Sequence, residues 1–245
     1  MTVKLPLFPL NTVLFPGAMI QLHVFEERYR LMVGRCIEQR SPFGVVLLRS
    51  GSEVNPNDPW FRQQVEAAGG GDAELNQLRL QLGGDALPYV VGTSAQINIG
   101  ESARLDDGRY YLIAQGQRRF RIQYFVQRQP YFIASVGYLP EESAAHPYGA
   151  GEQLRTVYAR YWAAVSALTG TAPPSESLPE SPSDLTYWMA HRLNVDNAQK
   201  QHWLEADVST RLREMSAALR AELALLPNGD AGERERGGPG SGSWN

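Results

Sequence analysis

The sequence is poor in the residues that most catalytic sites require. It has two lysines, Lys4 and Lys200, and neither lies in the Gly-x-x-x-x-Gly-Lys-Ser/Thr loop that binds nucleotide phosphates. No Gly-x-Ser-x-Gly turn is present to expose a serine nucleophile, and a Ser–Lys pair would have to use Lys200 in a polar helical stretch. We therefore predict that the chain is not an enzyme and has no catalytic and no cofactor-binding residue.

Metal ligands and reactive thiols are equally scarce. The four histidines are scattered and lack the His-Glu-x-x-His spacing or the cysteine partners of a zinc site, so we predict no metal. The single cysteine, Cys36, excludes an internal disulfide and favours a reducing compartment. Cys36 is either a nucleophile or a core residue. Its place on the apolar stripe of a helix favours the core, because burial raises the pKa of a thiol.

Long apolar runs and excess positive charge are also missing. No run approaches the roughly 18 apolar residues of a membrane-spanning helix, and prolines at positions 6, 9 and 16 interrupt the region where a secretory signal would lie. A net charge of −3 gives no overall attraction to nucleic acid or to an anionic membrane. We expect a cytoplasmic protein that makes no membrane contact.

Residues 1–140 contain the pattern of a small β-barrel with one helix. An apolar strand, the turn Pro16–Gly17 and a second strand at Met19–Phe25 lead into a predicted helix at Glu26–Gln39. Phe43–Leu48 is short and wholly apolar, which predicts a buried central strand. The helix carries one apolar stripe, formed by Tyr29, Met32, Val33, Cys36 and Ile37.

The second half of this region is also rich in strand patterns. Val91–Ile99 and Tyr110–Ala114 flank Asp106-Asp107-Gly108, which predicts a hairpin turn between them. Gly116–Tyr124 alternates polar and apolar residues, and Tyr131–Leu139 is the last expected strand. Because a closed barrel leaves few open edges, we predict a closed or nearly closed barrel. The residues of Gly116–Tyr124 expected to face inward are Phe120, Ile122 and Tyr124.

Three further segments complete the expected organisation. Residues 51–87 are rich in glycine and predict a surface insertion, which is either functional or tolerated decoration; we favour decoration. Residues 147–227 predict an α-helical subdomain, with Ser181, Asp196 and Asp207 as helix caps. Residues 228–245 have no apolar periodicity and predict a disordered tail.

The opening stretch also resembles a known family. Pro6–Gly17 and Phe25–Tyr29 match the P-L-F-P-L-x-x-V-x-F-P-G and F-E-x-R-Y patterns of the N-terminal domain of Lon-type ATP-dependent proteases. Gly116, Arg119 and Phe120 match the family's G-x-x-R-F element. The resemblance extends over about residues 3–226, and Gln199–Glu205 followed by Arg211-Leu212 resembles the family's Q-x-x-L-E…R-L pattern. The resemblance implies an α+β fold: a PUA-like β-barrel followed by an α-helical bundle subdomain. The 51–87 insertion departs from the family's shorter connection.

The same resemblance implies a function. In Lon proteases this region recognises unfolded or tagged substrates, while separate ATPase and peptidase domains perform the catalysis. The chain therefore resembles stand-alone Lon-domain proteins of bacteria, and we expect a non-catalytic module that binds unfolded or tagged polypeptide or a specific partner protein. A surface between the barrel and the helices is the expected place for such binding. Its candidate residues are Glu27, Arg28, Trp188 and Arg192.

Each of these candidates also has a purely structural interpretation. Glu26–Arg28 is either a charged lip for a ligand or the ordinary charged start of a helix, and we favour the helix start. Trp188, like Trp162 and Trp203, either grips apolar peptide or belongs to a helical core, and we favour the core.

An alternative partner is RNA. The stretch from Arg104 to Arg128 is rich in arginine, with Asp106 and Asp107 as its only acidic residues. Such a basic stripe on a PUA-like barrel would contact phosphates if its face is open, or would form structural ion pairs if it packs beneath the helices. Because the chain as a whole is acidic, we favour the structural role. The candidate RNA-binding residues are Arg109, Arg118, Arg119 and Arg121.

Overall fold

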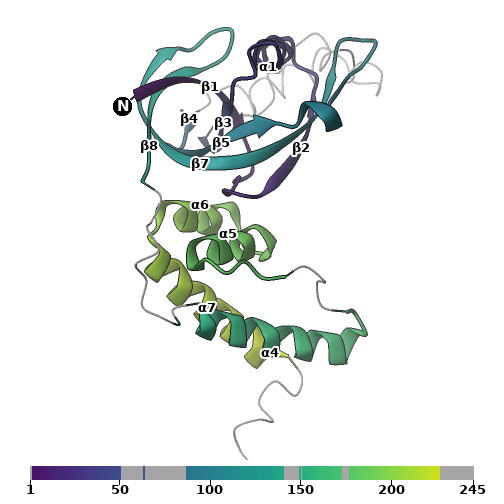
Figure 1. Cartoon of the computed structure of the whole chain (residues 1–245), viewed down its shortest axis with the longest axis vertical. Coiled ribbons are helices and arrows are strands. Elements are labelled where there is room, and N and C mark those ends of the chain that lie inside the picture. The colour runs from purple at the N-terminus through teal and green to yellow at the C-terminus, as the bar shows by residue number, and fades with distance from the viewer. Residues whose placement is uncertain are drawn as a thin grey trace, which may run out of the picture. The chain divides into compact units, whose positions relative to one another are not determined.

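The computed structural model describes residues 2–50, 63, 87–140, 149, 151–172 and 177–226 (Figure 1). The predicted insertion, apart from Gln63 and Leu87, and the predicted tail at 228–245 lie outside these residues. The chain divides into two compact units, and each is described by itself. The first comprises Met1–Glu142 and Tyr187–Ala206, and the second comprises Ser143–Thr186 and Asp207–Asn245.

Five strands of the first unit close into a barrel. Neighbours in the ring follow the order β1 (Thr2–Leu10), β8 (Ile133–Tyr138), β7 (Tyr110–Gln127), β5 (Val91–Ile97) and β3 (Phe43–Ser50). A parallel pairing between β1 and β3 closes the ring, while the other pairings in it are antiparallel. The predicted α+β fold with an N-terminal barrel is confirmed, and β3 is the predicted central strand.

Three short strands extend the barrel. β2 (Met19–Val24) and β6 (Ala103–Arg104) pair with opposite edges of the first part of β7, and β4 (Leu87–Pro88) pairs with β3. The turn at Asp106-Asp107-Gly108 joins β6 to β7, and Gly108 takes the positive φ of 83° that such a turn requires. The predicted hairpin turn is present, and the strand before it is β6, because a 3-10 turn at Ile99–Glu101 and β6 separate it from β5.

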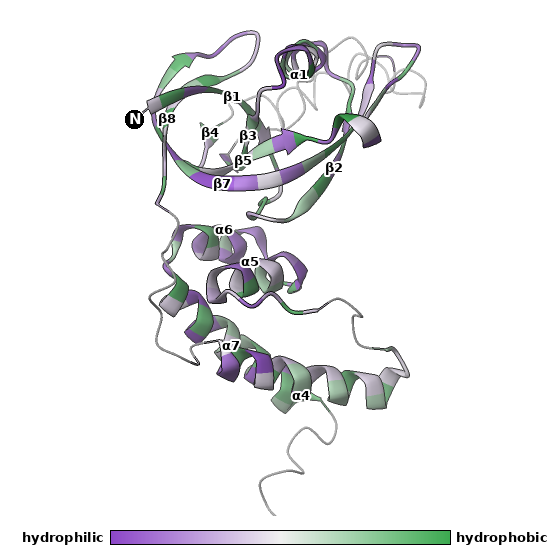
Figure 2. Cartoon of the chain, viewed as in Figure 1, coloured by the Kyte–Doolittle hydropathy of each residue, from purple (hydrophilic) through white to green (hydrophobic). Residues whose placement is uncertain are grey.

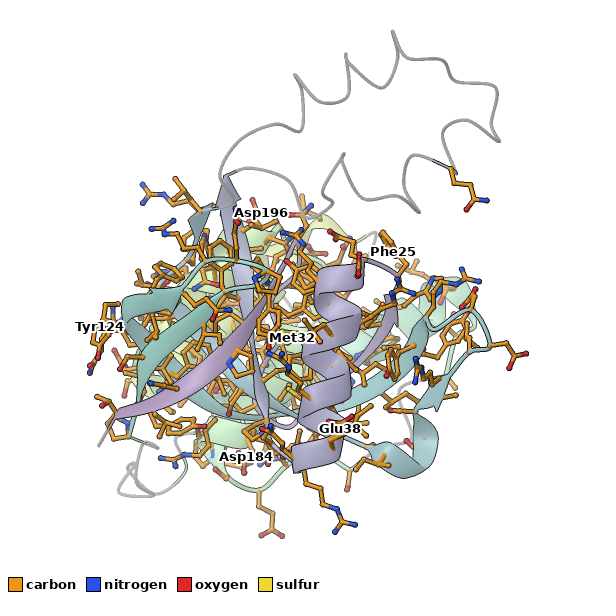
Figure 3. The ribbon with its side chains drawn as sticks, turned by 90° about the horizontal axis from the view of Figure 1, so that it is seen from above. Phe25, Met32, Glu38, Tyr124, Asp184 and Asp196 are labelled. Carbon is orange, nitrogen blue, oxygen red and sulfur yellow. The ribbon has the colours of Figure 1, made fainter. Side chains whose placement is uncertain are left out.

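Helix α1 (Glu27–Gln39) carries the predicted apolar stripe, which packs into the larger of the two barrel cores that the described residues form. The smaller core gathers around Phe120, Ile122 and Val136. Tyr124 was predicted to face inward with them, and that prediction was wrong: 61% of its surface is exposed, and Figure 3 shows it at the periphery. A shift of register between Ile122 and Tyr124 breaks the alternation of β7 and turns the tyrosine outward. Figure 2 shows the hydrophobic and hydrophilic bands along β7.

The segment Tyr187–Ala206 belongs to the barrel unit, although its position in the sequence placed it in the predicted subdomain at 147–227. It contains the end of α5 (Pro182–Arg192) and all of α6 (Asn197–Glu205). The amide of Gln201 donates a hydrogen bond of 3.1 Å to the carbonyl of Val91 on β5. The Tyr187 ring lies 6.2 Å from the Phe15 ring, and Trp203 is buried as a core residue.

The second unit is built on a pair of long helices. α4 (Glu152–Thr169) packs against α7 (Val208–Leu225), with Leu154, Met215 and Leu219 buried. Asp207 caps α7 by accepting a hydrogen bond from the backbone N–H of Thr210, as the sequence predicts. The apolar stripe predicted for α4 is less buried toward the C-terminal end of the helix, where Leu168 is 45% exposed.

Candidate functional site

The first pair of predicted site residues stands at the start of α1. Glu27 is exposed in the first helical turn, where negative charge is favourable. Arg28 donates a 2.9 Å hydrogen bond from its Nε to Glu26, which is buried, and its guanidinium lies 4.5 Å from the centre of the Tyr29 ring. Arg28 therefore neutralises a buried carboxylate, which is a structural task whatever else it contacts.

The second pair, Trp188 and Arg192, lies one helical turn apart near the end of α5. The Arg192 guanidinium stacks 3.9 Å from the Trp188 ring centre and donates to the Trp188 carbonyl at 3.4 Å. Trp188 is half-buried and Arg192 is exposed, so together they form a cationic and aromatic surface. Glu27 and Arg28 stand on α1, while Arg192 ends α5 and a four-residue connection (193–196) leads from it to α6. Figure 1 shows α1 and α6 at opposite ends of the barrel. The structure does not bring the two predicted pairs together.

The four candidate RNA-binding arginines do not form one stripe. Arg119 is buried, and its Nη1 donates to the carbonyls of Leu204 and Ala206 at 2.9 and 3.2 Å. Arg109 pairs with Asp107 at 2.6 Å. Hydrogen bonds from the backbone N–H and guanidinium of Arg109 hold the pKa of Asp107 below its ordinary value. Arg118, stacked 4.5 Å from Tyr138, and Arg121 remain exposed.

Cys36 lies in the larger barrel core, where burial raises the pKa of its thiol against a smaller lowering by Ser41. This agrees with the predicted core role. Within the described ranges, no three histidine, cysteine, aspartate or glutamate side chains are grouped so that they could hold a metal ion. In the same ranges no helix combines the length and the apolar character that crossing a membrane requires.

The outer edge of β2 is a candidate binding surface that the sequence pattern did not predict. In the described part of the chain this strand pairs with β7 alone, so its second edge faces away from the barrel. On the outer face of the β2–β7 ribbon, Met19 is 43% and Tyr111 is 56% exposed, and the His23 ring stacks on Tyr111 at 4.9 Å. An exposed strand edge beside apolar and aromatic side chains can pair with an extended polypeptide. The alternation of Met19, Gln21 and His23 was a signal for the outward face.

The comparisons with known proteins agree with this architecture. The solved Lon N-terminal domain protein from Xanthomonas campestris superposes with a TM-score of 0.55 at 24% identity, over 92% of this chain and 99% of that one. The N-terminal domain of the Mycobacterium avium complex Lon protease gives a TM-score of 0.52 at 16% identity, over 89% of this chain and 98% of that one. At these identities the likeness shows the fold alone.

The sequence also matches part of two longer Lon proteases. The chain is 24% identical to Lon protease 2 of Myxococcus xanthus over 91% of its length, and 27% identical to the Lon protease of Paraburkholderia phytofirmans over 93%. It spans only 24% and 25% of those two proteins. The family model for the substrate-binding domain of ATP-dependent protease La (LON) matches residues 4–221. The chain belongs to the LON substrate-binding domain family.

Proposed function

We propose that this chain is a non-catalytic module that binds unfolded or tagged polypeptide. The observation that carries the proposal is the match of the substrate-binding domain model to residues 4–221. That stretch is the barrel together with α4 to α7, so the recognition part of a Lon protease accounts for nearly all of the described structure. The module would bind the polypeptide and pass it to another protein, without cleaving peptide bonds or hydrolysing ATP.

The edge of β2 supports this function with a mechanism that does not depend on sequence. Main-chain hydrogen bonds to a strand edge are available to any unfolded chain, because every residue except proline carries both a donor and an acceptor. The outward residues Met19 and Tyr111 add apolar contact beside the edge. Folded proteins have few free extended segments, so such an edge would discriminate unfolded from folded partners.

The alternative is RNA binding through Arg118 and Arg121, whose exposure favours it. Two of the four predicted RNA-binding arginines, Arg119 and Arg109, instead bond to groups within the chain. Binding would then fall steeply with salt, since each phosphate contact releases counterions.

Amide hydrogen exchange with and without unfolded β-casein tests the proposal. We expect casein to slow exchange within Met19–Leu22 and to leave unchanged β8, which is paired on both sides by β1 and β7 and serves as the internal control. Casein should keep its intact mass after incubation with the protein, ATP and Mg²⁺. Slower exchange in other segments, and not in Met19–Leu22, would place the binding surface there instead of at β2. Fragmentation of casein by the pure protein would refute the non-catalytic role.

A further inference from the structure

A pocket of about 280 Å³ lies between α1 and the β6–β7 hairpin of the barrel unit. It is separate from the β2 edge, because β6 and β2 pair with opposite edges of β7. This volume is slightly below the roughly 300–1,000 Å³ of pockets that take drug-sized ligands, so it admits one large side chain and not a folded segment. Its lining residues are Gly34, Ile37, Glu38, Ile99, Ser102, Ala103, Arg104 and Tyr110.

One glycine and one long-range hydrogen bond lie beside the pocket. Gly34 stands in the middle of α1, where glycine is unfavourable for a helix, and a Cβ there would lie 3.3 Å from the Tyr110 hydroxyl. One turn earlier, Arg30 donates from its Nη1 to the Asp107 carbonyl at 3.2 Å, which ties the hairpin turn to the helix. The helix and hairpin are therefore joined at one end and leave a hollow beside Gly34.

The pocket walls are mainly apolar and carry one positive and one negative side chain. The apolar lining consists of Ile37, Ala103, Tyr110 and Ile99, and Ile99 is 46% exposed although it is a large aliphatic residue. Glu38 comes from the helix, and Figure 3 shows it near the end of α1. Arg104 comes from the hairpin, with its guanidinium 5.8 Å from the Tyr110 ring centre. An apolar pocket with a few placed polar groups is typical of a ligand site.

We infer that this pocket takes one large apolar side chain, aromatic or aliphatic, of a bound polypeptide. The inference rests on the proposed function and adds selectivity to it. Glu38 and Arg104 complement a cationic and an anionic group on the residues that flank the inserted side chain. A segment of mixed charge around one apolar residue fits this arrangement better than a uniformly acidic or uniformly basic one, so the pocket favours such segments among the unfolded chains that the edge of β2 accepts.

The direct test follows the isoleucine methyl signals during titration with two peptides, acetyl-Lys-Gly-Phe-Gly-Glu-amide and its serine analogue. The phenylalanine peptide should shift the methyls of Ile37 and Ile99, and the serine peptide should not. Ile122 lies in the other barrel core and is the internal control. Equal shifts with both peptides, or none at Ile37 and Ile99, would overturn the inference.

Two variants connect the pocket to unfolded chains. Ile99→Ser removes an exposed apolar side chain from the pocket wall with little effect on folding. Gly34→Leu fills the pocket with a side chain that is favourable in a helix. Because burial of a large apolar side chain contributes about tenfold or more to affinity, each should weaken casein binding by about that factor. Unchanged casein binding in both variants would overturn the inference that the pocket binds a side chain, and would leave the proposed function unaffected. Absence of casein binding by the unaltered protein would instead refute the proposed function, and the pocket would then stand or fall on the peptide shifts.

Discussion

The guanidinium of Arg119 binds the carbonyl of Leu204, 85 residues away, at 2.9 Å, and the carbonyl of Ala206 at 3.2 Å. These two carbonyls lie at the C-terminal end of α6, where the last backbone acceptors of a helix have no partner within the helix. A cation is also favoured at that end by the helix dipole. One side chain of β7 therefore satisfies the end of α6 within the barrel unit.

Replacing Arg119 by methionine should destabilise the protein strongly. The change leaves the two carbonyls without their buried donor, so we expect the free energy of unfolding to fall by about 2–4 kcal/mol. Urea denaturation measures this. Arg121→Met, an exposed change on the same strand, is the control and should alter stability by less than about 0.5 kcal/mol. Equal effects of the two changes would contradict the structural role of Arg119.

Gly116 supports a close approach between β7 and the turn before β2. A Cβ at this position would overlap the carbonyl oxygen of Phe15, and the Gly116 N–H donates to the Ala18 carbonyl at 2.8 Å. Gly116→Ala should therefore lower the free energy of unfolding by at least about 2 kcal/mol. At Gly100 a Cβ would meet its nearest atom at 3.7 Å, so Gly100→Ala should be nearly neutral. Thermal denaturation of both variants decides the point.

Asp207 should stabilise the start of α7 in a pH-dependent way. Its carboxylate accepts from the backbone N–H and hydroxyl of Thr210 at 2.9 Å each, and these bonds lower the pKa of Asp207. Because the pKa is lowered in the folded state, the contribution is present above about pH 4 and is lost as pH falls through the folded value. Asp207→Ala should lower unfolding free energy by about 1 kcal/mol at neutral pH. Asp207→Asn should retain most of the cap. A difference between wild type and Asp207→Ala that persists unchanged in acid would argue against this cap.

Cys36 gives a prediction of the opposite sign. Its pKa is raised by burial, so the folded state holds the thiol proton more tightly than the unfolded state. Stability should therefore fall as pH rises above about 8.5, the ordinary cysteine value. We expect the difference in unfolding free energy between wild type and Cys36→Ala to shrink from pH 8 to about pH 10. A thiol reagent should also label Cys36 slowly in the native protein and rapidly in urea. Fast native labelling would contradict the buried position.

Local patterns in the sequence predicted much of the barrel unit. The stripe of Tyr29, Met32, Val33 and Cys36 defined α1, and the predicted helix start differs from the observed one by a single residue. Asp196 and Asp207 cap their helices as expected, because a cap depends only on residues three positions apart. These features are local, so a sequence pattern contains nearly all of the information that determines them.

Features that depend on distant partners were not predictable in the same way. The outward turn of Tyr124 depends on a register shift against β8, which alternation along one strand does not reveal. The burial of Arg119 depends on α6, and the grouping of Tyr187–Ala206 with the barrel depends on which apolar faces meet. The pocket joins Gly34 to Tyr110 across the fold, and neither residue carries a sequence signal for it.

Fluorescence anisotropy can decide whether this chain binds unfolded polypeptide: labelled unfolded β-casein is titrated with the pure protein at low and high salt, beside a labelled single-stranded RNA. We predict saturable casein binding that survives high salt, because backbone pairing and apolar contact are screened little, and weak RNA binding that salt abolishes. Tight, salt-sensitive RNA binding without any casein binding would contradict it and would move the functional surface to Arg118 and Arg121. Binding to neither probe would also contradict it and would leave a specific partner protein as the expected ligand.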